Sequence, residues 1–129
     1  MAEKDVIRTD RAPGPFQGAP YNQAIRVGDL VFVAGQLGIS LDTGALAGAG
    51  VAEQTEQIMA NLGAILEAAG TGLENLVKTT VFLMDLENFA AMNEVYARHV
   101  GDRPPARSTI EISGLPSGAL VEIEAIAHV

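Results

Sequence analysis

The chain has 129 residues, of which 48% are hydrophobic and 5% aromatic, and it contains neither cysteine nor tryptophan. This length predicts one domain spanning residues 1–129 with an aliphatic core, and the lack of cysteine excludes disulfides, thiolate catalysis and thiolate metal sites. The net charge of −8, with only 8 Lys and Arg in the chain, disfavours a nucleic-acid partner bound through its phosphates.

The first half of the chain predicts three strands and one helix. The strands are expected over Val6–Thr9, Ala24–Val27 and Leu30–Ala34. Gly28-Asp29 separates the second and third of them, which is typical of a β-hairpin, and the Pro- and Gly-rich segment 12–20 is expected to be an ordered loop. Apolar residues recur at helical spacing from Val51 to Ala69, and Gly70 is suited to end that helix.

The second half predicts three more strands and a second helix. The strands are expected over Leu76–Met84, Arg107–Ile112 and Leu120–Ala127. Asp85 is a typical N-cap residue, so a helix is expected over Leu86–Val100, ended by Gly101. The segment 115–118 is expected to be a turn between the last two strands.

This order of elements predicts an α+β fold with about six strands in a mixed sheet and two helices on one face. The strands nevertheless carry apolar residues at both parities, as Val31 and Val33 alternate with Phe32. The second face of the sheet should therefore also be buried. In so short a chain the simplest cover is another copy of itself, so an oligomer is predicted.

Charged residues in the last two predicted strands suggest a chemical site. Arg107 begins one strand, and Glu122 and Glu124 share one face of the other. A guanidinium binds a carboxylate through two parallel hydrogen bonds, and a glutamate can transfer a proton. If the two strands pair, they make a small acid-binding site without metal or cofactor. The alternative from the residue types alone is a surface salt bridge between neighbouring strands.

Several blocks of the chain, taken together, resemble the RidA (YjgF-type) family over nearly its whole length. These blocks are Ala34-Gly35-Gln36, Val77–Leu83, Asp85-Leu86, Phe89, Asn93–Tyr96, Pro105-Ala106-Arg107-Ser108 and Glu122–Ala127. The resemblance implies a chorismate-mutase-like fold and a homotrimer with pockets between subunits. It also implies a hydrolytic deaminase that converts reactive enamines and imines, such as 2-aminoacrylate and 2-iminopropanoate, to 2-keto acids and ammonia.

The resemblance also implies roles for individual residues. Arg107 would bind the substrate carboxylate, and Glu122 would activate water and help protonate the leaving nitrogen, a role that Glu124 on the same face could share or hold. Tyr21 would line the pocket. The further substrate-binding positions that the resemblance implies are Gly35, Asn93, Ser108 and Thr109. No cofactor and no metal is implied.

Two positions depart from the common family pattern and leave the substrate open. Ala34 replaces a serine found in many members, and Thr109 replaces a cysteine. The alternatives are a protein that binds or senses a small 2-keto acid without turnover, and a deaminase of a larger catabolic enamine. Ribonuclease activity, credited to some members, is disfavoured by the charge and by the scarcity of aromatic residues.

The remaining exclusions concern membranes and metals. No apolar run has the length of a membrane span, and Met1–Asp5 lacks the basic and apolar regions of a signal peptide. His99 and His128 form no ligand-spacing pattern. A soluble, cytoplasmic protein is therefore expected.

Overall fold

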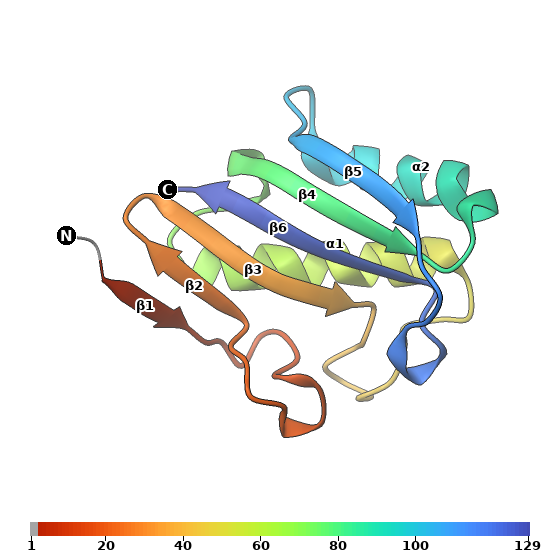
Figure 1. The fold of residues 1–129 in the computed structure, drawn as a ribbon, viewed down its shortest axis with the longest axis horizontal. Coiled ribbons are helices and arrows are strands. Elements are labelled where there is room, and N and C mark those ends of the chain that lie inside the picture. The colour runs from red at the N-terminus through yellow and green to blue at the C-terminus, as the bar shows by residue number, and fades with distance from the viewer. Residues whose placement is uncertain (1–2) are drawn as a thin grey trace.

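The computed structural model describes residues 3–129. They form a six-stranded mixed sheet with two α-helices on one face (Figure 1). The strands are β1 (Lys4–Ile7), β2 (Ala24–Val27), β3 (Leu30–Leu37), β4 (Leu76–Leu83), β5 (Ala106–Glu111) and β6 (Val121–His128). The helices are α1 (Val51–Ala68) and α2 (Phe89–Val100), and short 3-10 turns lie at Phe16–Gly18, Leu73–Asn75, Leu86–Asn88 and Pro116–Gly118.

The strand order is β1-β2-β3-β6-β4-β5, and every pair is antiparallel except β4 and β5. A parallel pair needs a crossover connection, which α2 supplies between β4 and β5. The last strand β6 is thus inserted between β3 and β4. The predicted α+β architecture is confirmed.

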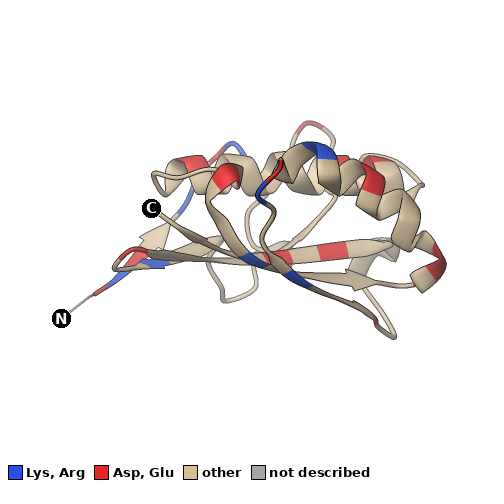
Figure 2. Cartoon of the chain, turned by 90° about the horizontal axis from the view of Figure 1, so that it is seen from above, with Lys and Arg blue, Asp and Glu red and all other residues tan. Residues whose placement is uncertain are grey.

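The core lies between the sheet and the two helices. Figure 2 shows both helices on one side of the sheet and none on the other. Fully buried side chains of α1 and α2, among them Ile58, Leu62 and Met92, meet alternate strand residues such as Val81 and Ile123. Within residues 3–129 no helix is both long and apolar enough to cross a bilayer.

The other face of the sheet, called the open face below, carries apolar side chains that nothing within residues 3–129 covers. Phe32 is 43% exposed and Ile110 is 45% exposed. Both lie on strands whose alternate residues are buried under the helices or face them. Both faces of the sheet therefore carry apolar side chains, as expected from the sequence. The oligomer stays a prediction that this exposed apolar surface supports.

The clearest differences from the predicted boundaries are in β1, β3 and α2. Strand β3 runs to Leu37, three residues beyond its predicted end. The first strand begins at Lys4 rather than Val6, because it pairs with β2 in the register Lys4↔Val27. Asp85 does act as a cap, accepting the Glu87 N–H at 2.9 Å, but the turn that it caps is the 3-10 turn Leu86–Asn88. The second α-helix consequently starts at Phe89.

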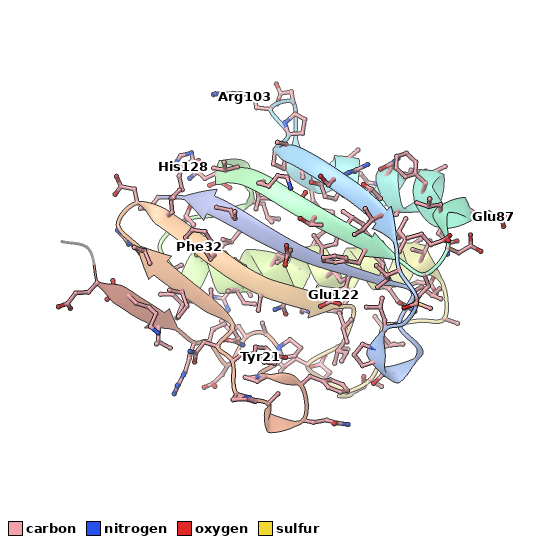
Figure 3. All side chains as sticks on the ribbon, in the orientation of Figure 1. Tyr21, Phe32, Glu87, Arg103, Glu122 and His128 are labelled. Atoms are coloured by element: carbon pink, nitrogen blue, oxygen red, sulfur yellow. The ribbon has the colours of Figure 1, made fainter. Side chains whose placement is uncertain are left out.

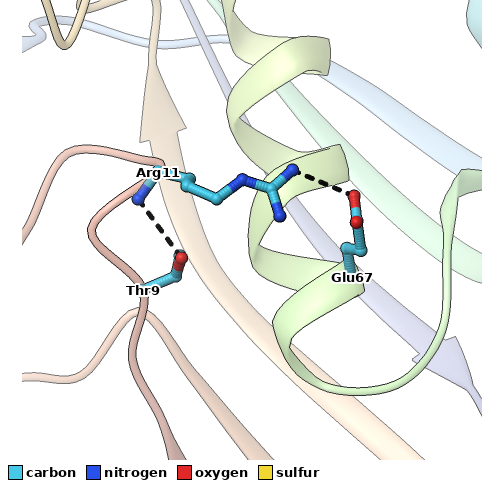
Figure 4. Close-up of polar contacts among 3 residues, drawn as sticks. All are labelled: Thr9, Arg11 and Glu67. Atoms are coloured by element: carbon cyan, nitrogen blue, oxygen red, sulfur yellow. Dashed lines mark hydrogen bonds and ion pairs between the residues drawn. The ribbon is translucent and has the colours of Figure 1, made fainter.

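The loop between β1 and β2 is held in place by buried and exposed polar contacts. Gln23, only 4% exposed, donates to the carbonyls of Thr9, Ala12 and Pro13 and accepts the Thr9 N–H at 2.7 Å. At the surface Arg11 bonds Glu67 of α1 at 3.1 Å, and this pairing lowers the pKa of the Glu67 carboxyl (Figure 4). The segment expected to be an ordered loop is thus fixed to the body of the protein.

Candidate active site

A pocket of about 370 Å³ opens at one end of the open face, where β3 and β6 meet two turns. We call it the Glu122 pocket. It is lined by Phe16, Ala19, Tyr21, Ala34, Gly35, Leu37, Pro116 and Glu122. Figure 3 shows Glu122 and Tyr21 toward this end of the sheet. Most of these side chains are apolar, and the carboxyl of Glu122 is the one ionisable acid among them.

A bulge in β3 shapes the floor of this pocket. The register of β3 against β6 shifts between Val33↔Ala125 and Gln36↔Ile123, so β3 has one extra residue there. A Cβ atom built on Gly35 would lie 2.2 Å from Oε1 of Glu122, well inside van der Waals contact. Any side chain at this position would force the Glu122 carboxyl to move, and glycine brings the backbone of β3 against that carboxyl.

The carboxyl of Glu122 is half-buried, and within residues 3–129 it has no cationic partner. Burial raises its pKa, and the nearby negative charge of Glu124 raises it further. A carboxylate with a raised pKa is a stronger base than an ordinary glutamate, and its protonated form persists to higher pH. This is the property that proton transfer in a pocket requires.

Glu124 is placed differently, although it lies on the same face of β6. Its side chain is exposed and pairs in register with Thr80 of β4. It lines a separate hollow that includes Phe32 and Lys78, and it does not line the Glu122 pocket. Geometry within one chain therefore favours Glu122 for proton transfer.

Tyr21 lines the pocket, as the resemblance implies, but its hydroxyl has a structural partner. The hydroxyl oxygen accepts the Phe16 N–H at 2.6 Å, while the residue as a whole is 41% exposed. Gln17 in the same turn has a positive φ of 53°, a conformation that costs a non-glycine residue energy. The Tyr21 bond thus helps to fix a strained turn, and its ring forms part of the pocket wall.

Arg107 lies on β5, the outer strand of the sheet, and its side chain turns toward α2. Its guanidinium carbon is 4.9 Å from the centroid of the Tyr96 ring and 5.5 Å from that of Phe89. Tyr96 in turn shares a hydrogen bond of 2.6 Å with Thr79 on β4. Arg107, Phe89, Tyr96 and Thr79 are called the Arg107 platform below.

Arg107 does not form the surface salt bridge considered from the sequence. Among residues 3–129 the ion pairs join Arg11 to Glu67 and His99 to Glu56, and none includes Arg107. The cation is therefore held by ring faces, with its N–H groups unclaimed by any carboxylate of this part of the chain.

The structure separates Arg107 from Glu122 within one chain. Strand β4 lies between β5 and β6, so the strands do not pair as the proposed neighbouring arrangement required. Arg107 faces α2, opposite the buried Thr79, whereas Glu122 pairs with Phe82 and faces the open side. Alternation fixes faces within a strand, but it does not determine which strands are neighbours.

The other residues that the resemblance implies divide between the two faces. Gly35 lies with Glu122, and Ser108 lies on the open face of β5 in register with Thr80. Thr109 shares the helix-side face with Arg107. Asn93 lies on α2 between Phe89 and Tyr96 at helical spacing, and its buried Oδ1 has no hydrogen-bond partner.

Sequence reasoning placed Tyr21, Ala34 and Gly35 at the pocket, but it missed the two turns that complete its walls and the rings beneath Arg107. A signal for the walls exists, because the turns Phe16-Gln17-Gly18-Ala19 and Pro116-Ser117-Gly118-Ala119 both end in Gly-Ala. In both turns the residue before glycine and the glycine itself have positive φ. Two similar turns thus form the rim of one pocket. The signal for the rings is the spacing of Phe89 and Tyr96 on one stripe of α2.

Comparison with known proteins identifies relatives along nearly the whole chain. Residues 11–129 match the family model described as Endoribonuclease L-PSP. A RutC family protein of Pyrococcus abyssi is 49% identical over 125 residues, covering 97% of each chain. The 2-iminobutanoate/2-iminopropanoate deaminase of Homo sapiens is 42% identical, covering 95% of this chain and 88% of its own length.

The fold matches solved structures of the same group. A crystal structure of E. coli TdcF with bound serine superposes with a TM-score of 0.89 at 38% identity, covering 97% of this chain and 98% of that chain. The family includes proteins named as imine deaminases, and the resemblance inferred from the sequence blocks is confirmed. The chain belongs to the Endoribonuclease L-PSP family, the YjgF/RidA family of proteins.

Proposed function

We propose that this protein hydrolyses small 2-imino acids and their enamine tautomers to 2-keto acids and ammonia. The observation that carries the proposal is the half-buried Glu122 carboxyl, which has a raised pKa and rests against Gly35 in an apolar pocket. The names of relatives support the reaction class, since a human protein 42% identical is a 2-iminobutanoate/2-iminopropanoate deaminase. The absence of cysteine favours a reducing compartment, and we place the reaction in the cytoplasm.

The chemistry requires little beyond orientation and proton transfer. The imine carbon is already electrophilic, so a water activated by the Glu122 carboxylate adds to it and gives a tetrahedral aminoalcohol. Glu122 passes the proton taken from water to the imine nitrogen, which completes the neutral aminoalcohol. It then moves the hydroxyl proton to the amine, the C–N bond breaks, ammonia leaves, and the carbonyl of the 2-keto acid forms. An enamine first takes a proton on its terminal carbon to become the imine. Arg107 holds the substrate carboxylate bidentately throughout, which keeps the carbon near the water.

The site requires two copies of the chain, because Arg107 and Glu122 face opposite sides of one sheet. We propose a homotrimer in which the open faces meet and the outer strand β5 of one copy lies beside the Glu122 pocket of the next. The exposed Phe32 and Ile110 on the open face give this assembly an apolar surface to bury.

The test follows the imine directly. An amino-acid oxidase generates 2-iminopropanoate from alanine, semicarbazide traps it, and the loss of trapped product reports hydrolysis. Wild type should accelerate the loss, and Arg107→Ala and Glu122→Gln should each remove most of the acceleration, by about 10²- to 10⁴-fold. Arg103→Ala is the matched control, since this exposed arginine lies away from Glu122 (Figure 3), and it should behave as wild type.

Two other outcomes would redirect the assignment. If wild type is folded and trimeric, binds pyruvate, and leaves trapping unchanged, the protein is a binder of small 2-keto acids. If it hydrolyses the imines of leucine or phenylalanine faster than that of alanine, the substrate is a larger enamine. The apolar walls of the pocket, including Ala34, Leu37 and Pro116, are the observation that favours this second candidate.

RNA cleavage is not part of the proposal, although the family model carries that description. The chain has 16 acidic residues against 8 Lys and Arg. Figure 2 shows the basic residues scattered over the ribbon instead of gathered on one face. A phosphate backbone would meet no positive surface patch of the kind that RNA-binding proteins use.

A further inference from the structure

We propose that Tyr96 is a positioning residue for substrate binding: its ring, fixed by a hydrogen bond to Thr79, holds the Arg107 guanidinium in place to receive a carboxylate. The inference rests on the proposed function in one respect, that Arg107 is the carboxylate anchor. It adds to that function the group that sets the direction of the anchor.

The contact between Arg107 and the two rings is close enough to orient the cation. The guanidinium carbon is 4.9 Å from the Tyr96 centroid and 5.5 Å from the Phe89 centroid, both within the roughly 6 Å over which a ring face attracts a cation. Tyr96 is the more rigid of the two rings, since it is 5% exposed whereas Phe89 is 42% exposed. Tyr96 should therefore set the position of the guanidinium, with Phe89 as a weaker support.

Thr79 fixes the Tyr96 ring to the strand beside Arg107. Its hydroxyl is 2.6 Å from the Tyr96 hydroxyl, and Thr79 is fully buried. In the parallel pairing of β4 and β5, Thr79 lies directly opposite Arg107. The backbone that carries the arginine and the bond that holds the ring therefore belong to adjacent positions of one sheet.

Burial raises the pKa of the Tyr96 phenol, while the Thr79 bond and the Arg107 charge act in the opposite direction. Because burial dominates, the phenol stays neutral at physiological pH and keeps its bond to Thr79. Arg107 therefore contacts a neutral phenol, with no negative charge that would compete with a substrate carboxylate.

Contacts with the two rings leave Arg107 free to bind a substrate carboxylate, whereas a salt bridge within the protein would not. A carboxylate partner would hold the arginine firmly, but it would also occupy the N–H donors that the substrate needs. Ring faces hold the plane of the guanidinium and leave the N–H groups on its rim available. Restricting the long side chain before binding lowers the entropy lost when the substrate is captured.

The test compares three substitutions through both turnover and binding. Tyr96→Leu removes the ring, Tyr96→Phe keeps the ring and removes the hydroxyl, and Phe89→Leu removes the exposed ring. For Tyr96→Leu we expect KM for 2-iminopropanoate and Kd for pyruvate to rise about 10-fold while kcat changes less than about 3-fold. Tyr96→Phe keeps the ring but loses the bond to Thr79 that fixes it, so KM and Kd should rise by a smaller amount, about 3-fold.

A double-mutant cycle shows whether Tyr96 acts through the arginine. In an Arg107→Ala background, Tyr96→Leu should cause no further loss of pyruvate affinity, because the group that it positions is gone. Arg98→Ala, at an exposed position of the same helix, is the control and should leave all constants unchanged. Equal losses from Tyr96→Leu in the two backgrounds would overturn the proposal.

A measurement without ligand separates this proposal from the proposed function. The guanidinium carbon of Arg107 lies over the Tyr96 ring, which should shield this side chain, so the Nε–H resonance of Arg107 should move downfield in Tyr96→Leu and stay near its place in Tyr96→Phe. If wild type fails to hydrolyse imines but still binds pyruvate with the expected Tyr96 dependence, the deaminase assignment fails and the positioning role holds. If wild type does not bind pyruvate, or if the resonance does not move, the positioning role is overturned.

Should Tyr96→Leu fail to fold because Tyr96 is buried, Phe89→Leu decides the question. Phe89 is exposed, so its truncation should leave the fold intact while raising Kd for pyruvate about 3-fold. An unchanged Kd in folded Phe89→Leu, with Tyr96→Phe also unchanged, would then overturn the role of the platform.

Discussion

The Glu122 pocket and the Arg107 platform are built in different ways. The pocket joins two regions of the chain that are distant in sequence: the loop before β2 with the bulge of β3, and the turn Pro116–Gly118 with the start of β6. The platform comes from the consecutive elements β4, α2 and β5. The pocket therefore depends on long-range backbone contacts, whereas the platform depends on two rings and one hydroxyl.

The two regions also carry opposite charges, each without a partner in the same chain. Glu122 is partly desolvated and lacks a cation, and Arg107 lacks a carboxylate, among the residues that the structure describes. Such groups are costly in isolation and are retained where a ligand or a second subunit completes them. The unpaired acid in the pocket and the unpaired cation on the platform indicate that neither region is a complete site by itself.

The prediction with the largest expected effect tests whether the Arg107 platform of one copy meets the Glu122 pocket of another. Arg107→Ala and Glu122→Gln chains should each be nearly inactive, but refolding them together in equal amounts should restore about a quarter of wild-type activity. The reason is that, in the proposed trimer, each site combines Arg107 from one chain with Glu122 from another. The measurement is imine hydrolysis by the mixed oligomer, with each variant refolded alone as control. No recovery in a mixed, folded oligomer would show that the two residues do not meet between copies.

A second prediction tests the bulge beneath Glu122. Gly35→Ala places a methyl group where Oε1 of Glu122 lies, so the carboxyl must move and activity should fall about 10²-fold. Gly114→Ala is the matched control, because nothing lies within 4 Å of a Cβ atom built there. The measurement is kcat/KM for 2-iminopropanoate on folded protein. Unchanged activity in Gly35→Ala would show that the position of the carboxyl is not critical.

The difference between local and long-range contacts also explains how much of the fold could be predicted from the sequence. Hydrophobic periodicity located α1 and most strands within a residue or two, because these patterns are local. It placed the start of the second helix too early, since Asp85 caps a 3-10 turn as readily as an α-helix. The strand order, with β6 between β3 and β4, depends on contacts across the whole chain and could not be read from any local pattern.

The site residues illustrate the same limit. Alternation gave the residues that share a face within each strand, but the registers of β5 and β6 against β4 decide that Arg107 and Glu122 lie on opposite faces of the sheet. The ring faces that hold Arg107 were not predicted, because Tyr96 fits the apolar stripe of α2 equally well as a core residue. The roles of these residues came from the family resemblance and stay predictions.

A third prediction concerns the loop that forms one wall of the pocket. Gln23→Leu leaves the carbonyls of Ala12 and Pro13 without their donor, so the free energy of unfolding should fall by about 1–3 kcal/mol. Gln57→Leu is the control, since that partly buried side chain makes one hydrogen bond, to Asn61. Urea denaturation measures both. Equal effects of the two substitutions would mean that Gln23 does not hold the loop.

The smallest expected effect concerns the stability cost of the Glu122 carboxylate. Burial raises the pKa of Glu122 above its value in the unfolded chain, so the folded protein binds this proton more tightly. The proton on Glu122 therefore stabilises the folded state relative to the unfolded chain. This stabilisation is fully present below the pKa of the unfolded chain and is lost as pH rises through the pKa of the folded protein. Glu122→Gln, which is neutral at every pH, should therefore raise the urea midpoint slightly at pH 7 and have less effect at pH 4.

This last comparison is best made in an Arg107→Ala background. There no guanidinium from a neighbouring copy can reach the pocket and lower the pKa of Glu122, so the direction set by burial is measured alone. Restoring Arg107 should then shrink or reverse the gain, because an opposite charge stabilises the carboxylate that glutamine lacks. Glu124→Gln is the control for the smaller contribution of the neighbouring acid. A gain of equal size in both backgrounds would mean that Arg107 and Glu122 remain apart in the assembled protein, as they are within one chain.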